Sequence, residues 1–278
     1  MKMTFNKKIL GYVVFGIAVV IAFLYLRFPG KVIGDYIIAA VSANNPDAVL
    51  TIGAVKPYFP PGVKFLNIAY GSKQNPGATL RVDDLTARLS LISLLKGKTA
   101  LLLNGNVYGG TLKGRCEYAK FLSLSKLIKY EIRVSDVGLD RFAYAKGTFN
   151  RNITGKLNGS FVYHRSYDRV GEGSGTAEFT IVNGSYQLLS NLLGFDSIDF
   201  SRIEGRLSMK GDALKVEKIG LSGAKFNCSL KGEVALDKNI DSSSLTITGA
   251  VEVAGMGGRK IGVAVGGILK NPTVRLIP

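Results

Sequence analysis

The chain has 278 residues, and 36 Lys and Arg against 20 Asp and Glu give it a formal net charge of +16. One histidine and two cysteines cannot supply the clustered ligands of a structural zinc site, so no metal and no cofactor is expected. The positive charge fits either a solvated surface or attraction to anionic lipid headgroups. Nucleic acid is not an expected partner, because no basic helix or platform of aromatic and basic residues stands out.

The first predicted element is an apolar helix over Ile9–Leu26, a run of 18 residues without a charge. As a helix it would be about 27 Å long, close to the ~30 Å hydrocarbon core of a bilayer. No small-residue cleavage site follows closely, which favours an uncleaved anchor over a signal peptide. Basic residues before the run favour a cytoplasmic N-terminus. The predicted anchor side chains are Ile9, Leu10, Val13, Phe15, Ile17, Val20, Phe23 and Leu26.

Residues 1–30 are therefore predicted to form a cytoplasmic stub and a transmembrane anchor. Residues 31–47 then place apolar side chains on one helical stripe, which predicts an amphipathic helix. This helix could lie on the membrane surface or cap the sheet that follows. Capping is the favoured interpretation, since an exposed apolar sheet end needs cover.

Residues 48–278 are predicted to form one elongated β domain. Apolar and polar residues alternate in most of its segments, most clearly in Ala224–Asp237, as in a strand with one apolar face. Turns are expected at Tyr108-Gly109-Gly110, at Asn183-Gly184 and at Gly211-Asp212. A change of parity predicts a bulge near Lys218.

Short helices are predicted at Leu91–Leu95 and Tyr186–Leu193. The remainder gives roughly a dozen to sixteen strands joined by short turns, which makes neighbouring strands antiparallel. A half-polar sheet of this size must curl, close or pack on itself.

The predicted fold class is thus mainly β, with an N-terminal transmembrane helix followed by an elongated antiparallel sheet. The more specific form, a curled open trough or half-barrel, is what the family resemblance given below implies. The apolar side chains expected to line the groove are Leu157, Phe161, Phe179, Ile181, Leu207, Met209, Phe226, Cys228, Leu230, Val234, Leu236, Leu245, Ile247 and Val251.

The sequence contains no complete catalytic or phosphate-binding motif. Gly97-Lys98-Thr99 ends like a phosphate-binding loop, but Ile92 stands where that motif needs a glycine. His164 lies on the polar face of a predicted strand, and the sequence identifies no nucleophile for it. Cys116 and Cys228 lie on apolar faces, which favours buried thiols over a disulfide. We expect no catalytic residue, and the chain is not predicted to be an enzyme.

Three segments resemble the GspN family of type II secretion system proteins: Lys56–Phe65 with its proline turn, Leu89–Lys98 and Leu103–Gly114. The later repeats resemble the wider AsmA-like group. The resemblance implies a bacterial inner-membrane protein whose single N-terminal helix carries a curled periplasmic sheet with an apolar trough. It supplies no catalytic residues.

Two functions of different class follow from this comparison. In the first, the protein is a structural component of a type II secretion system, and its partners are the inner membrane and other secretion proteins. In the alternative, the groove holds phospholipid acyl chains, and the protein binds or transfers lipid. An open trough would expose more apolar area than is usual for a monomer, whereas a trough filled by its own side chains has no room for lipid. Small inward residues fit both close packing and an open channel; they are Gly159, Ala177, Gly205, Ala224, Gly232 and Gly249.

Overall fold

A single fourteen-stranded sheet dominates the computed structural model of the chain. The structure describes residues 7–59, 62–73, 77, 79–119, 127–142, 152–165, 173–192, 195–237, 242–254 and 260–277. The strands are β1 (Ala48–Tyr58), β2 (Gly62–Ser72), β3 (Thr79–Leu89), β4 (Thr99–Val107), β5 (Gly110–Tyr118), β6 (Leu127–Gly138), β7 (Lys156–Arg165), β8 (Gly173–Leu192), β9 (Phe195–Lys210), β10 (Ala213–Ser222), β11 (Phe226–Ala235), β12 (Ser244–Val253), β13 (Lys260–Ile268) and β14 (Asn271–Ile277). The helices are α1 (Lys7–Leu26), α2 (Gly30–Asn44), α3 (Leu91–Leu95) and the 3-10 helix η1 (Leu139–Arg141).

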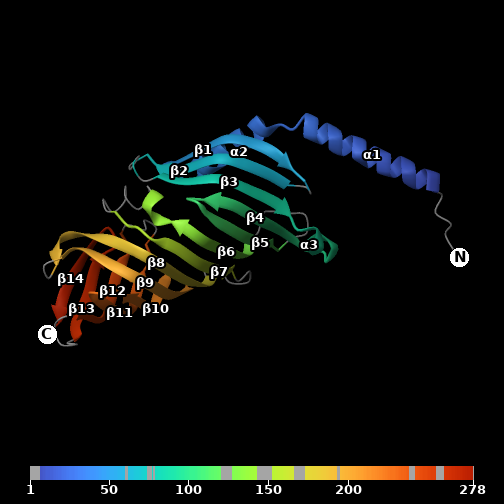
Figure 1. Ribbon diagram of the computed structural model, residues 1–278. Coiled ribbons are helices and arrows are strands. Elements are labelled where there is room, and N and C mark those ends of the chain that lie inside the picture. Colours follow the sequence, from blue (N-terminus) through green and yellow to red (C-terminus); the bar gives the residue numbers. More distant parts are fainter. Residues whose placement is uncertain are drawn as a thin grey trace.

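The strands follow one another across the sheet in sequence order, and every neighbouring pair is antiparallel. The sheet does not close, so β1 and β14 are its two edges. Figure 1 shows the sheet curling along its length, with β10–β14 turned beneath the middle strands. The prediction of a mainly β, antiparallel architecture with few helices is confirmed.

The alternation of apolar and polar residues explains why these segments form strands with two unlike faces. In β11, Phe226 and Val234 are 5% and 6% exposed, whereas Asn227 and Lys231 between them face solvent. The even-numbered side chains of this strand therefore turn inward, as a side-chain period of two requires.

Three local features of the chain match their sequence signals. Tyr108 (φ 49°) and Gly109 (φ 78°) form the turn between β4 and β5, and Gly211 (φ 59°) lies in the turn between β9 and β10. The expected bulge is present, because the register of β10 shifts between Val216 and Ile219.

Two predictions were wrong, and both fall in β8. Asn183-Gly184 forms no turn, and the predicted helix over Tyr186–Leu193 is a strand up to Leu192, where β8 ends and pairs with β9; Leu193 lies outside the described residues. A two-residue hairpin of this type needs a positive φ at both central residues. Only Asn183 has one (φ 53°), which bends the strand without reversing it. Pairs such as Tyr186 with Ile198 then hold the segment extended despite its helix-like pattern.

The N-terminal helix α1 occupies the predicted position. Over the described residues, however, none of the helices combines the length and the apolar character needed to cross a bilayer, so the predicted transmembrane span is not supported. The helix projects away from the sheet (Figure 1), and near its end the hydroxyl of Tyr25 donates a hydrogen bond to the carbonyl oxygen of Pro57 at 3.2 Å.

The second helix, α2, forms where the apolar stripe predicts it and packs on the edge strand β1. Gly34 is buried in this contact, and a Cβ atom there would lie 3.3 Å from Cγ2 of Val55. The helix therefore lies against the apolar side of β1 and does not extend across the rest of the sheet.

The most tightly packed core lies in the C-terminal half of the sheet. Val216, Val234 and Leu245, from β10, β11 and β12, are 3%, 6% and 8% exposed and form one cluster. The partly buried apolar side chains that pack against this cluster are Leu207, Leu214, Ile219, Leu236, Ile247 and Leu269.

Candidate functional site

The candidate site is the apolar face of the sheet, where side chains from different strands form continuous rows. The first row crosses all strands through directly paired residues: Val55, Phe65, Leu85, Gly105, Leu112, Val134, Gly159, Phe179, Gly205, Ile219, Leu230, Gly249, Val263 and Leu276. The second row is Pro57, Val63, Ala87, Leu103, Gly114, Ile132, Phe161, Ala177, Leu207, Val216, Gly232, Ile247, Val265 and Val274. Neither row contains a charged side chain, so one apolar surface runs from edge to edge.

The register brings the predicted lining residues of β7–β12 onto this face. Phe161, Phe179, Leu207, Leu230 and Ile247 are members of the two rows. Those that flank the rows on the same face are Leu157, Ile181, Met209, Phe226, Cys228, Val234, Leu245 and Val251. Leu236 follows β11 and packs against the core cluster. Their shared face is confirmed, and their role as a ligand lining stays a prediction.

Some glycines of the two rows are covered by a large side chain on the neighbouring strand, so they leave no opening in the apolar surface. A Cβ atom on Gly205 would overlap the ring of Phe179, and one on Gly249 would lie 2.8 Å from Cδ2 of Leu230. Large side chains of the adjacent strands therefore cover these glycines. The small inward residues were compatible with either close packing or an open channel, and at Gly205 and Gly249 the structure shows close packing.

A hollow of about 320 Å³ lies on this face over β6–β9, with β8 between β7 and β9, and Ile128, Tyr130, Tyr163, Arg165 and Met209 line it. The rings of Tyr130 and Tyr163 stack with centroids 5.0 Å apart. Burial raises the pKa of the Tyr130 phenol, and the neighbouring Tyr163 adds to the effect. The C-terminal half contains a buried core cluster, whereas this hollow leaves room on the apolar face for a ligand group.

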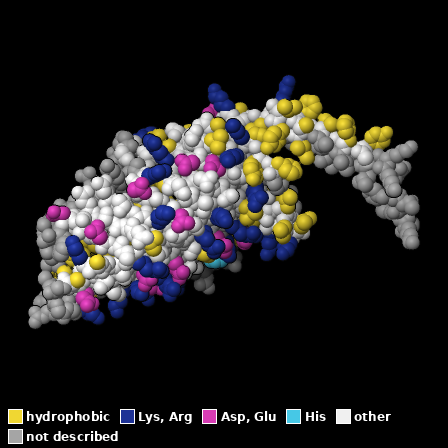
Figure 2. Space-filling model, in the orientation of Figure 1, with side chains coloured by type: hydrophobic (Ala, Val, Ile, Leu, Met, Phe, Trp, Pro, Cys, Tyr) yellow, Lys and Arg dark blue, Asp and Glu magenta, His cyan; other side chains and the backbone are white. Residues whose placement is uncertain are grey.

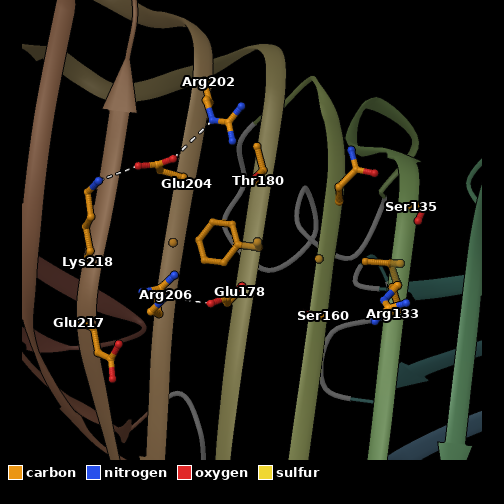
Figure 3. A pocket seen from close by; sticks show the side chains of 15 residues that line it. Arg133, Ser135, Ser160, Glu178, Thr180, Arg202, Glu204, Arg206, Glu217 and Lys218 are labelled. Atoms are coloured by element: carbon orange, nitrogen blue, oxygen red, sulfur yellow. Dashed lines mark hydrogen bonds and ion pairs between the residues drawn. The ribbon is translucent and has the colours of Figure 1, made fainter.

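A larger hollow opens toward the opposite, polar face, where the sequence predicted no site. It measures about 670 Å³ and collects polar side chains from β6–β10 (Figure 3). Four members of the first row, Val134, Gly159, Phe179 and Gly205, also contribute to its lining, whereas Ile132, Phe161 and Leu207 of the second row do not. The alternation of residues within each strand predicts a polar face. Which polar residues of different strands lie together depends on the register of the strands.

Ion pairs cross the strands of this polar hollow. Nε of Arg206 lies 2.9 Å from Oε1 of Glu178, and Nζ of Lys218 lies 2.7 Å from Oε1 of Glu204 (Figure 3). The hydrogen bond from Lys218 lowers the pKa of Glu204, and the charge of Arg202 acts in the same direction. The carboxylates of Glu178 and Glu204 are thus each paired with a cation, while Glu217 also lines the hollow.

The residues considered for chemistry lie apart from one another. His164 is exposed on β7. Cys116 on β5 and Cys228 on β11 are both free, as predicted, but they are only half-buried, and burial raises the pKa of each thiol. Within the described ranges, no three His, Cys, Asp or Glu side chains are grouped closely enough to hold a metal ion.

No protein-family model, no curated protein and no solved structure matches this chain.

Proposed function

We propose that this protein is a component of a bacterial type II secretion system, tethered to the inner membrane by α1, with its sheet in the periplasm. The observation that carries the proposal is the placement of the three segments that resemble the GspN family. Lys56–Phe65, Leu89–Lys98 and Leu103–Gly114 lie in β1–β5 and α3, which are adjacent in the sheet. They therefore form one continuous part of the molecule, next to the helix that would anchor it.

The exposed side chains of α1 support the tether. Phe15, Phe23 and Leu26 are 69%, 64% and 83% exposed, and other large apolar residues of this helix are similarly uncovered. Such a surface is costly in water and stable in hydrocarbon. Lys7 and Lys8 at the start of the helix favour a cytoplasmic N-terminus, and a periplasmic sheet is consistent with that orientation.

The secretion role is tested by deleting the gene and following a type II substrate. The substrate should accumulate in the periplasm, and expression of the intact chain from a plasmid should restore export. Normal export by the deletion strain would contradict the role. In the same cells, membrane fractionation reports the tether independently, because an untethered protein would appear in the soluble periplasmic fraction.

A second candidate function is the binding of lipid acyl chains, and the apolar rows with their hollow at Tyr130, Tyr163 and Met209 favour it. A charge at Met209 should oppose an acyl chain there, whereas a charge at Ser208 would point to the other face. Native mass spectrometry of the detergent-extracted protein should show bound phospholipid, retained in Ser208→Glu and lost in Met209→Glu. Lipid-free parent protein would end this idea.

A further inference from the structure

The short helix α3 is built with its polar side inward and its apolar side outward. Ser90 and Ser93 are each 6% exposed, whereas Leu91, Ile92 and Leu95 are 48%, 70% and 89% exposed. Apolar residues on a helix of a soluble protein normally face the core. We call Leu91, Ile92 and Leu95 the α3 tip.

Polar contacts hold α3 in this orientation. The hydroxyl of Ser90 accepts a hydrogen bond from the backbone N–H of Ser93 at 3.3 Å, as an N-cap residue does, and Oγ of Ser93 donates to Oγ of Ser90 at 2.9 Å. From β5, Nη2 of Arg115 donates to Oγ of Ser93 at 3.1 Å, while its Nε contacts Glu117 at 2.8 Å. Since the serines are fixed beneath the helix, the α3 tip is directed outward by bonded neighbours.

The α3 tip lies at the end of the sheet from which α1 projects. The bond from Tyr25 to Pro57 places the base of α1 beside the end of β1, and α3 follows the end of β3 two strands away. Figure 1 shows α1 and α3 at the same end, and Figure 2 shows apolar side chains gathered there. Phe59, just past β1, adds another side chain that is 64% exposed.

The charged residues nearest the α3 tip along the chain are lysines, and Glu117 beneath the helix is paired with Arg115. Lys96 and Lys98 follow the α3 tip and are exposed, and no acidic residue occurs between Asp84 and Glu117. A cluster of apolar side chains with flanking lysines suits the interface of a bilayer, where the apolar groups enter the acyl boundary and the ammonium groups meet anionic headgroups.

We propose that the α3 tip is a second membrane contact, which inserts Leu91, Ile92 and Leu95 into the interface of an anionic bilayer and draws that end of the sheet onto the membrane surface. This inference rests on the proposed function in one respect: the tether α1 must bring the end of the sheet that carries α3 to the bilayer. It assigns a separate role to α3, which would fix how the sheet stands on the membrane.

The test uses a fluorescent reporter, since the chain contains no tryptophan. Full-length Leu95→Trp is reconstituted into vesicles of phosphatidylcholine and phosphatidylglycerol, with and without lipids brominated on the acyl chain. Its emission should shift to shorter wavelength and lose intensity with the brominated lipids. Val274→Trp, on the exposed far edge of the sheet, should show neither change. Lys96→Glu with Lys98→Glu should reduce the quenching of the Leu95→Trp reporter.

Flotation on a density gradient separates the possible failures. Protein that floats with the vesicles while Leu95→Trp stays unquenched would overturn the role of α3 and leave the tether intact. A shift to shorter wavelength without quenching would also overturn it, because it would mean that protein covers the tip. Protein that fails to float would refute the tether and this inference together.

Discussion

At the scale of single residues, Gly232 on the apolar face is a position where neighbouring backbone leaves no room for a side chain. A Cβ atom on Gly232 of β11 would lie 2.6 Å from the Cα atom of Ile247 on β12. Because backbone cannot move as a side-chain end can, the two strands would have to separate. Gly220 of β10 differs, since its nearest neighbours are ends of the flexible Glu204 and Lys218 side chains at 3.5 Å or more.

We therefore expect Gly232→Ala to destabilise the protein by about 1–3 kcal/mol, the usual cost of overpacking. Gly220→Ala should be neutral or stabilising by up to about 1 kcal/mol, because it reduces the entropy of the unfolded chain. Urea unfolding followed by circular dichroism measures both variants. Equal stabilities of the two would contradict the packing described here.

A second residue-scale prediction concerns Asp84 on β3. Its carboxylate accepts a hydrogen bond from Nδ2 of Asn106 at 2.6 Å and lies 3.2 Å from Nζ of Lys64. The bond from Asn106 is the main cause that lowers the pKa of Asp84 below its ordinary value of 3.8, and Lys64 adds to it against a smaller opposing effect of burial. Since the folded state has the lower pKa, the charged form stabilises the fold above pH 3.8, and this contribution is lost as the pH falls through the folded value.

Asp84→Asn should accordingly lower the thermal midpoint at pH 7, and the difference from the parent should shrink once the pH is below 3.8. The exposed neighbour Asp83 gives the matched control, Asp83→Asn. A difference for Asp84→Asn that stays constant between pH 7 and pH 3 would show that the carboxylate charge is not what stabilises this site.

At the scale of elements, the last strand is an unprotected edge. Every described residue of β14 is exposed, and Val274 and Leu276 of the apolar rows are 56% and 50% exposed. An edge strand with apolar side chains and unpaired backbone groups is a template for pairing with another chain. Two residues of β14 oppose such pairing: Pro272 lacks a backbone N–H donor, and Arg275 carries a charge.

Replacing both Val274 and Leu276 with lysine should reduce self-association of the purified protein and leave the thermal midpoint nearly unchanged, because the edge side chains bury little area. Sedimentation velocity over a range of protein concentrations measures the association. Thr273→Lys, on the polar face of the same strand, is the control for added charge alone. Unchanged association in the double variant would exclude β14 as the contact.

Elements were predicted well where one local pattern decides the structure. The alternation in β11, the glycine turns after β4 and β9 and the parity change in β10 each act over a few residues, and the structure confirms them. The pattern failed in β8, where pairing with β9 outweighed a helical spacing and an Asn-Gly signal. The helix α3 was predicted, but its inverted orientation depends on Arg115, a residue on another strand.

At the scale of the whole molecule, the candidate site could be predicted only in part. Its residue types and their common face follow from alternation within each strand. The two rows and the polar hollow depend on how strands are registered against one another, which no single segment encodes. The uneven filling of the apolar face also depends on tertiary packing, since the buried cluster at Val216, Val234 and Leu245 requires the curl of the C-terminal half.

This uneven packing predicts uneven protection from hydrogen exchange. Amides of β10–β12, whose side chains form the buried cluster, should exchange more slowly than amides of β2, in which none of the described residues is fully buried. Mass spectrometry of peptides after timed exchange measures the difference. Equal protection of the two regions would mean that the sheet opens as one cooperative unit.

The order of the strands has a consequence for how the protein is made. Each strand pairs only with the strands just before and after it, so no segment has to wait for a distant partner. Loops that close over short stretches cost little entropy, and contacts between near neighbours form quickly. A chain that emerges from a ribosome or an export channel one strand at a time can add each hairpin to a template that is already folded, and assembly can advance in step with delivery.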